Sequence, residues 1–468
     1  MTDSVLVIAL AGHANVGKTS LVSALTRDAT LLVDEKAGTT TASYDKTFSI
    51  AGEEVLRFVD TPGFEFASRI NRWLDERGDS AGPDGRTRIQ AFLGAEVHDR
   101  HVLEKEALRG VLAADVIAYV ADVSLAPEGQ VVQEVRLLRR AGVPMIGVLN
   151  NLHAGADPAE WVDMLRREGV DNIVQLDALR FPADQEEGFY RALSVLRPEQ
   201  ASRLDRVQRL REQLDDELLV SSALVIGEVL VDCLAYRREE RFGSDEEAKK
   251  ARSGVNRRFQ ETLCEREARG FRDLARVYGF GGSQVEGGEL DVPSWSGAVT
   301  DDLFDADSIK RYGVSAGTLG AVGAVTGSFL DAVGGFGIGT VIGGGMGVAA
   351  GLLLGRQVST RIEAGTVVVG PVDAVQFPSV LLNRALACWM AVRARSHADR
   401  SRVEVRVDPE RLDAREVGGL IRKARSCSKH PEWSAIDGSG DPDRAKAVRD
   451  LGKLAEQLLR KQRDAGPT

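Results

Sequence analysis

The chain has 468 residues, too many for one ordinary hydrophobic core, and this length predicts about three folding units. Hydrophobic residues make up 43% and charged residues 28%, which excludes a globally disordered chain and a transporter with many membrane spans. The net charge of −10 disfavours long-range attraction to nucleic acid, so we expect nucleic acid to be an unlikely partner.

Residues 1 to about 180 alternate short β-branched runs with helical stretches. This alternation predicts an α/β domain with a mainly parallel sheet and helices on both faces. Continuous apolar runs place the strands at Val5–Ala11, Val55–Val59, Val116–Val120, Met145–Leu149 and Ile173–Leu176. Helices are expected at Thr19–Thr26, around Thr87–Leu112 and at Pro158–Arg167.

A glycine-rich motif directly follows the first strand. The stretch GHANVGKTS, from Gly12 to Ser20, matches G-x-x-x-x-G-K-[ST] with a strand before it and a helix after it. In such a loop the backbone N–H groups surround phosphates, and the helix N-terminus adds its positive dipole end. Lys18 is placed to reach the β- and γ-phosphates and the Thr19 hydroxyl to bind Mg²⁺. The motif therefore predicts a P-loop nucleoside triphosphatase.

Two further segments have the composition of a metal and phosphate site. Asp60 ends a strand and opens D-T-P-G, so its carboxylate can hold the Mg²⁺ shell through water while the Gly63 amide contacts the γ-phosphate. A threonine cluster at residues 39–41 lies in the sequence between the glycine-rich motif and Asp60. We predict that Thr40 completes the metal site when the loop closes over triphosphate, with Thr39 as the alternative.

These motifs resemble those of the Era- and TrmE-like GTPases of the translation-factor class. The resemblance rests on G-H-A-N-V-G-K-T, G-T-T and D-T-P-G-F in that order and covers roughly residues 4–180. It implies GTP and GDP as ligands, Mg²⁺ as cofactor, and hydrolysis of GTP to GDP and phosphate in a molecular switch. In potassium-activated members an asparagine at the place of Asn15 helps to coordinate K⁺. Phe64 stands where Ras-like enzymes have a water-positioning glutamine, which implies slow intrinsic turnover.

The base-recognition motif departs from the family pattern N-K-x-D. Asn150 is retained after the strand MIGVL, but His153 stands at the aspartate position. A neutral imidazole offers one acceptor nitrogen and cannot replace a bidentate carboxylate. Guanine selectivity is therefore weakened or supplied elsewhere, for which Asp177 and Ala178 are candidates, and ATP stays an alternative ligand.

The resulting assignments combine catalytic, cofactor-binding and metal-binding groups. Catalytic roles are predicted for Lys18, Thr40 and Gly63. Nucleotide contacts are predicted for Gly12, Asn15, Val16, Gly17, Lys18, Thr19, Ser20 and Asn150. The predicted Mg²⁺ ligands are Thr19, Thr40 and Asp60, and the predicted K⁺ ligand is Asn15.

The remainder of the chain is expected to be mostly α-helical. After the GTPase domain at 1–197, apolar residues at three- and four-residue spacing predict a helical domain with a linker at 198–300. A glycine-rich apolar hairpin is expected at 301–360 and a further helical region at 361–468. The segment D-D-L-F-D at 301–305, followed by apolar glycine-rich sequence, resembles a bacterial family in which an Era-like GTPase is fused to a C-terminal domain of unknown function.

The glycine-rich hairpin raises the question of membrane association. Gly313–Leu330 and Ala332–Gly355 each lack charge and are long enough to span hydrocarbon, and glycine recurs every four residues from Gly335 to Gly355. Basic residues flank the two outer ends, which keeps both ends cytoplasmic. Glycine entropy and Asp331 oppose insertion, so two packed helices in a soluble core are the alternative.

These features set the expected location and partners. Four scattered cysteines and the lack of a secretory signal predict a cytoplasmic protein, located at the inner face of the cell membrane if the hairpin inserts. The expected partners are guanine nucleotide, a membrane or integral membrane protein, and a second copy of the chain. Two alternatives stay open: a ribosome- or RNA-associated assembly GTPase, and a membrane interaction protein that binds nucleotide with little turnover.

Overall fold

The structure of the chain, a computed structural model, describes residues 5–26, 44–50, 53–95, 101–150, 157–179, 183–280, 290–291, 358–372, 377–396, 403–404, 414–438 and 441–465. Two units have separate internal contacts. The first comprises Met1–Leu214 with Ala394–Arg400, and the second comprises Asp215–Arg393 with Ser401–Thr468. The four-part partition expected from the sequence stays a prediction.

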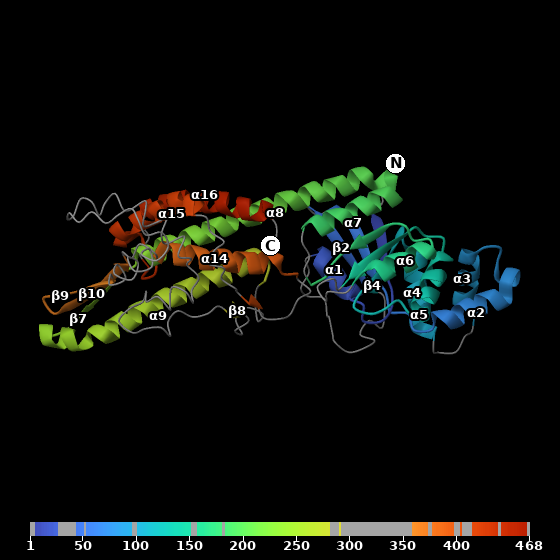
Figure 1. The fold of residues 1–468 in the computed structure, drawn as a ribbon, viewed down its shortest axis with the longest axis horizontal. Helices are drawn as coiled ribbons and strands as arrows, with labels where there is room; N and C mark the ends of the chain where they lie inside the picture. Colours follow the sequence, from blue (N-terminus) through green and yellow to red (C-terminus); the bar gives the residue numbers. More distant parts are fainter. Residues whose placement is uncertain are drawn as a thin grey trace, which may run out of the picture. The chain divides into compact units, whose positions relative to one another are not determined.

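A six-stranded sheet organises the first unit (Figure 1). Its strand order is β2-β3-β1-β4-β5-β6, and every neighbouring pair is parallel except β2 with β3. The register pairs Leu10 with Asp60, so the ends of β1 and β3 lie at the same edge of the sheet. The strand bounds are β1 Leu6–Ala11, β2 Tyr44–Ile50, β3 Glu53–Asp60, β4 Val116–Asp122, β5 Met145–Asn150 and β6 Ile173–Gln175.

Helices cover both faces of this sheet. Alternate residues of β1 enter two different cores, Ala9 and Ala11 in one and Ile8 and Leu10 in the other, because strand side chains point to opposite faces. Helices α2, α3, α4, α5 and α6 line the first core, and α1, α7 and the first part of the next long helix line the second. The helix bounds are α1 Lys18–Thr26, α2 Ala67–Arg77, α3 Gly85–Gly94, α4 Val102–Ala113, α5 Gly129–Arg139, α6 Ala159–Arg167 and α7 Ala183–Leu196, with short 3-10 helices at Gly78–Ala81 and Pro198–Gln200.

The second unit is built mainly from long helices, which run lengthwise beside one another in Figure 1. Its helices are α8 Ala201–Ala235 (whose first part belongs to the first unit), α9 Asp245–Val277, α14 Phe377–Ala394, α15 Ala414–Arg425 and α16 Pro442–Asp464, with 3-10 turns at Ser426–Lys429 and Pro431–Trp433. A small antiparallel sheet of order β7-β10-β9 joins them, formed by β7 Arg238–Arg241, β9 Val358–Glu363 and β10 Thr366–Val372. A parallel pair joins β8 Leu290–Asp291 and β11 Val403–Glu404.

Close approach of α8 and α16 depends on glycine. A Cβ atom added to Gly227 would lie 2.8 Å from the Val448 carbonyl oxygen and 3.0 Å from the Gly452 nitrogen. Backbones at this separation leave no room for a side chain, so the two helices pack through small residues. Around this contact, one apolar core unites the long helices with β10.

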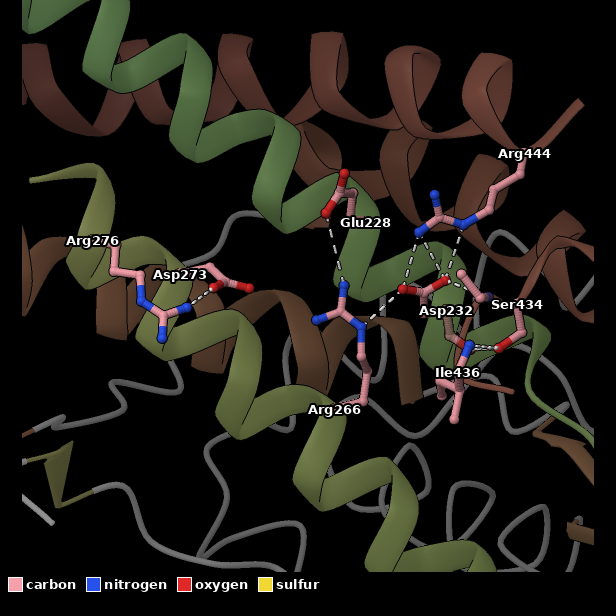
Figure 2. Close-up of polar contacts among 9 residues, drawn as sticks. Glu228, Asp232, Arg266, Asp273, Arg276, Ser434, Ile436 and Arg444 are labelled. Atoms are coloured by element: carbon pink, nitrogen blue, oxygen red, sulfur yellow. Dashed lines mark hydrogen bonds and ion pairs between the residues drawn. The ribbon is translucent and has the colours of Figure 1, made fainter. Parts of the chain in front are cut away.

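A buried ionic cluster also links three helices of the second unit (Figure 2). Asp232 on α8 is 2% exposed. It accepts hydrogen bonds from Arg266 Nε of α9 at 2.8 Å, from Arg444 Nη2 of α16 at 3.0 and 3.1 Å, and from the Ala435 backbone at 2.9 Å. We refer to Asp232, Arg266 and Arg444 as the Asp232 cluster.

The fold class expected from the sequence is confirmed, as are the five predicted strands. The helical stretch predicted around Thr87–Leu112 is two helices, α3 and α4, rather than one. Strand β2, helices α2, α5 and α7, and the small sheet of the second unit were not predicted. Residues 301–357 of the predicted hairpin lie outside the described residues, and 358–360, which were assigned to it, belong to strand β9.

One described stretch, Pro198–Ala235, is long and apolar enough to cross a membrane by length and composition. Its 18-residue window has a mean hydropathy of 2.1, and 67% of that window is buried inside the protein. Packing of α8 in the core of the second unit accounts for this apolar character.

Candidate functional site

The predicted phosphate loop lies between β1 and α1, as the motif requires. Gly12 and Gly17 have φ values of 148° and 90°, which side chains rarely adopt. Asn15 also has a positive φ, 62°, a conformation that asparagine tolerates better than most residues, and it is exposed. The loop backbone thus turns through left-handed conformations at three of its predicted positions.

Lys18 is the first residue of α1, where the loop ends, and is 6% exposed. Its Nζ donates hydrogen bonds to the carbonyl oxygens of Gly12 at 3.2 Å and His13 at 2.7 Å. Burial lowers the pKa of Lys18 to about 8, against the charges of Asp60 and Glu134, which raise it. A desolvated ammonium gains much from an anionic ligand bound in direct contact with it, as a phosphate would be.

Thr19 and Asp60 bring a hydroxyl oxygen and a carboxylate together beside the loop. The Thr19 hydroxyl donates to Asp60 Oδ2 at 2.5 Å, although the two residues are 41 positions apart. The other carboxylate oxygen, Oδ1, is buried without a hydrogen-bond partner, and burial raises the pKa of Asp60. A hydroxyl and a carboxylate with an unsatisfied oxygen are the ligand types that Mg²⁺ prefers, so these residues fit the metal.

The backbone after Asp60 lies directly against the phosphate loop. A Cβ atom on Gly63 would lie 2.6 Å from both Cα and N of Ala14, so only glycine fits there. The Phe64 backbone N–H donates to the Gly12 carbonyl at 3.2 Å. The Phe64 side chain is fully buried in the core that α2 and α5 line. The structure therefore brings Gly63 to the loop and turns the phenyl ring away from solvent.

Two helices hold the next residues of this segment. Glu104 on α4 is buried, and its Oε1 accepts from the Phe66 backbone at 3.2 Å. Gln130 on α5 donates to the Glu65 carbonyl at 2.8 Å. These contacts come from residues that sequence reasoning missed.

A second missed group connects His13 of the loop to the protein interior. His13 Nδ1 lies 2.7 Å from Glu134 Oε1, and the Tyr119 hydroxyl donates to Glu134 Oε2 at 3.1 Å. Glu134 is fully buried, and this burial raises its pKa, while the hydrogen bond to Glu134 raises the pKa of His13. The sequence does contain one indication of this group. Glu134 is a charged residue on the apolar face of α5, beside Val135 and Leu138, and such a position predicts a buried carboxylate with a polar partner.

Asn150 links the phosphate loop to the strand end where the base is expected. It is 1% exposed, its Nδ2 donates to the Val16 carbonyl at 2.8 Å, and its Oδ1 accepts from the Ala178 backbone at 2.9 Å. The structure thus unites the predicted residues of the loop with Asp60, Gly63 and Asn150. Thr39, Thr40 and His153 lie outside the described residues, so their roles stay predictions.

Comparisons with known proteins match two different families to two parts of the chain. Residues 7–151 match the family described as 50S ribosome-binding GTPase. The GTPase Era of Acidimicrobium ferrooxidans is 34% identical over 113 residues, covering 23% of this chain and 33% of that protein. The GTPase Der of Maridesulfovibrio salexigens is 31% identical over 126 residues, covering 25% of this chain and 28% of that protein. The chain thus spans a third or less of these curated relatives.

Among solved structures, Era in complex with MgGDPNP and nucleotides of 16S ribosomal RNA aligns with 40% of this chain and 56% of its own, at 20% identity and a TM-score of 0.30. A probable GTP-binding protein engB aligns with 41% of this chain and 99% of its own, at 19% identity and a TM-score of 0.27.

The largest match lies in the C-terminal part of the chain. Residues 163–456 match the family described as domain of unknown function (DUF3482), which is more than half of the chain. The protein therefore belongs to the DUF3482 family and carries a P-loop GTPase domain of the Era/Der type at its N-terminal end.

Proposed function

We propose that this protein binds GTP with Mg²⁺ and hydrolyses it to GDP and phosphate as a molecular switch. The observation that carries the proposal is the Thr19–Asp60 pair, with an unsatisfied carboxylate oxygen beside a buried lysine in the phosphate loop. The hydroxyl and the carboxylate supply ligands for a divalent cation, and the lysine supplies a positive charge for the phosphates. Phosphoryl transfer from a nucleotide requires both. The Era/Der-type domain supports guanine nucleotide as the ligand.

Each group has a separate task in this proposal. Lys18 would bind the β- and γ-phosphates, and Thr19, Asp60 and Thr40 would hold Mg²⁺. Bound Mg²⁺ supplies neutralisation of the charge on the phosphate oxygens. The Gly63 N–H donates to the γ-phosphate.

The buried position of Phe64 supports slow turnover, because its phenyl ring cannot orient the attacking water. Asn15 is exposed at the loop, where its side-chain oxygen can coordinate K⁺. We therefore expect hydrolysis to be faster in K⁺ than in Na⁺, as in the potassium-activated GTPases that the loop resembles.

The test combines nucleotide binding with single-turnover hydrolysis. Fluorescent GTP, GDP and ATP are titrated against the full chain and against Lys18→Ala, with the exposed Lys250→Ala as control, and turnover is then followed with Mg²⁺ in K⁺ or Na⁺. We expect Lys18→Ala to weaken GTP binding at least about 100-fold, since a charge-assisted contact in a dry site is lost. Equal affinity of the two lysine variants would refute the nucleotide site, and equal binding of ATP would refute guanine selectivity.

We also propose a cytoplasmic location at the inner face of the membrane, through residues 313–355. The two uncharged runs and their flanking basic residues support this proposal. Flotation of the full chain with liposomes, beside a chain lacking residues 313–355, tests it. Flotation of neither protein would refute the membrane location. Cosedimentation with 50S subunits would instead favour a ribosome-associated GTPase, the activity class that the description of the N-terminal match suggests.

A further inference from the structure

Arg211 of α8 is a buried cation that contacts three elements of the first unit. It is 7% exposed, and its Nη2 donates to the carbonyl oxygen of Leu25 near the C-terminal end of α1. Its Nε lies 3.0 Å from Glu186 Oε1 on α7. Its guanidinium carbon lies 4.1 Å from the centre of the Phe48 ring on β2. One guanidinium therefore joins α8 to α1, α7 and β2.

Two of these elements connect directly to the proposed nucleotide site. Helix α1 begins with Lys18 and Thr19, so Arg211 binds the opposite end of the helix whose first turn carries the phosphate and metal ligands. A cation at a helix C-terminus is favoured by the helix dipole. Strand β2 pairs with β3, and Tyr44 lies opposite Asp60 in that register. A shift of α1 or β2 on nucleotide binding therefore changes the distances that Arg211 must satisfy.

Helix α8 continues past these contacts into the second unit. It is a single helix of 35 residues, and the boundary between the units falls after Leu214. The next turn is held by different partners, because Asp216 accepts from Arg460 Nη1 at 3.0 Å and Arg463 Nη1 at 2.5 Å, both on α16. Arg211 and Asp216 are about 7.5 Å apart along the helix axis. One helix is thus fastened to the nucleotide-binding unit and to the helical unit within two turns.

We infer that Arg211 is the positioning residue through which nucleotide occupancy of the phosphate loop is transmitted along α8 to the helical unit. The inference rests on the proposed nucleotide site, and it adds the route by which that site acts on the helical unit. A purely structural arginine would hold α8 equally in every nucleotide state. A coupling residue makes the state of α8 depend on the nucleotide, and by linkage makes nucleotide affinity depend on Arg211.

Hydrogen exchange of the full chain tests this route. Exchange is compared without nucleotide, with GDP and Mg²⁺, and with a non-hydrolysable GTP analogue and Mg²⁺, and is read in peptides covering residues 12–26 and 216–235. In the wild-type protein we expect nucleotide to change exchange in both peptides, by at least about fivefold in the second, the lower range of allosteric coupling. Arg211→Ala is expected to keep the response in 12–26 and lose it in 216–235.

Arg209→Ala is the matched control, because Arg209 is an exposed arginine on the same helix. It is expected to keep both responses. If Arg211→Ala does not fold, Arg211→Lys serves instead: its single ammonium keeps the charge but not the planar fork that contacts three elements, so the response in 216–235 should fall as well.

The possible failures are distinguishable. No response in 12–26 of the wild-type protein would refute the nucleotide site itself. A response in 12–26 without one in 216–235 would leave that site intact and overturn the coupling. A full response of both peptides in Arg211→Ala, or in Arg211→Lys where that variant is used, would show that the signal does not pass through Arg211.

Discussion

Gly63 illustrates how closely two backbones approach at the proposed site. Because its missing Cβ would lie 2.6 Å from Ala14, Gly63→Ala must push the segment after Asp60 away from the phosphate loop. We expect single-turnover hydrolysis to fall about 100-fold, the usual effect of losing one N–H donor to the transferring group. GDP affinity should change little, since GDP lacks the γ-phosphate. Gly94→Ala is the control, because a Cβ there meets no atom within 4 Å; equal rates of the two variants would contradict the prediction.

The His13–Glu134 pair predicts a pH-dependent stability of the first unit. Both pKa values are raised in the folded chain, so the folded state binds more protons and its stability falls as pH rises. The stabilisation from His13 is fully present below its ordinary value of 6.5 and is lost as pH rises through the raised pKa.

Glu134→Gln removes this dependence, because glutamine keeps the hydrogen-bonding shape without the charge. We expect its free energy of unfolding to vary less with pH than that of the wild-type protein between about pH 5.5 and 8.5. Denaturant-dependent hydrogen exchange of β1 reports this free energy for the first unit alone. Parallel pH profiles of the two proteins would rule out the pair as the cause.

Sequence alone indicated the part of the site that is local in the chain. The phosphate loop follows from nine consecutive residues, and Asp60 and Gly63 follow from a short motif at a strand end. Glu134 could not be found in this way, because its contact with His13 joins positions 121 residues apart. Such contacts depend on which side chains the fold buries and on how its strands pair. A pattern of neighbouring residues in the sequence determines neither.

At the level of elements, the Asp232 cluster is a buried contact between three helices that one substitution disrupts. Asp232→Ala would leave Arg266 and Arg444 without their shared carboxylate in the interior of the second unit. We expect a loss of about 3 to 5 kcal/mol in stability, the usual cost of removing one partner of a buried ion pair. Denaturant unfolding of the second unit, followed by hydrogen exchange in α9, measures it.

The neighbouring Asp273 provides the control, as Figure 2 shows. Its pair with Arg276 is solvent-exposed, with 34% and 53% of the two side chains accessible. Asp273→Ala should cost about 0 to 1 kcal/mol. Equal losses for the two aspartate variants would mean that the Asp232 cluster does not stabilise the second unit.

The elements that sequence analysis found and missed differ in how they are buried. Strands β1, β4 and β5 are covered on both faces, so they read as continuous apolar runs. Strand β2 is at the sheet edge and has the mixed sequence YDKTFSI, which resembles a polar loop. Helix α2 is strongly charged, and only a few of its residues are buried. Strands β9 and β10 form a hairpin, but the third strand of their sheet, β7, comes from more than a hundred residues earlier in the chain.

At the level of the whole molecule, two units with separate cores predict two unfolding transitions. Nucleotide with Mg²⁺ at about 100 times its Kd would stabilise the first unit by about 2.7 kcal/mol. This corresponds to a rise of roughly 5 to 10 °C in its transition, and the second transition should move less. Scanning calorimetry with and without GDP measures both. A single transition that moves as a whole would contradict two separately stable units.

The packing of α8 against α16 has a consequence for synthesis of the chain. Leu230 and Val231 of α8 share a core with Leu451 and Ala455 of α16. At ~5–20 residues per second, roughly 10 to 45 s pass between translation of Leu214 and of Pro442. Most of the nucleotide-binding unit has emerged by the first time, whereas the face of α8 that packs against α16 has no partner until the second. We expect chaperones that shield apolar helices to bind the nascent chain in this interval, so that chaperone supply limits the yield of soluble protein.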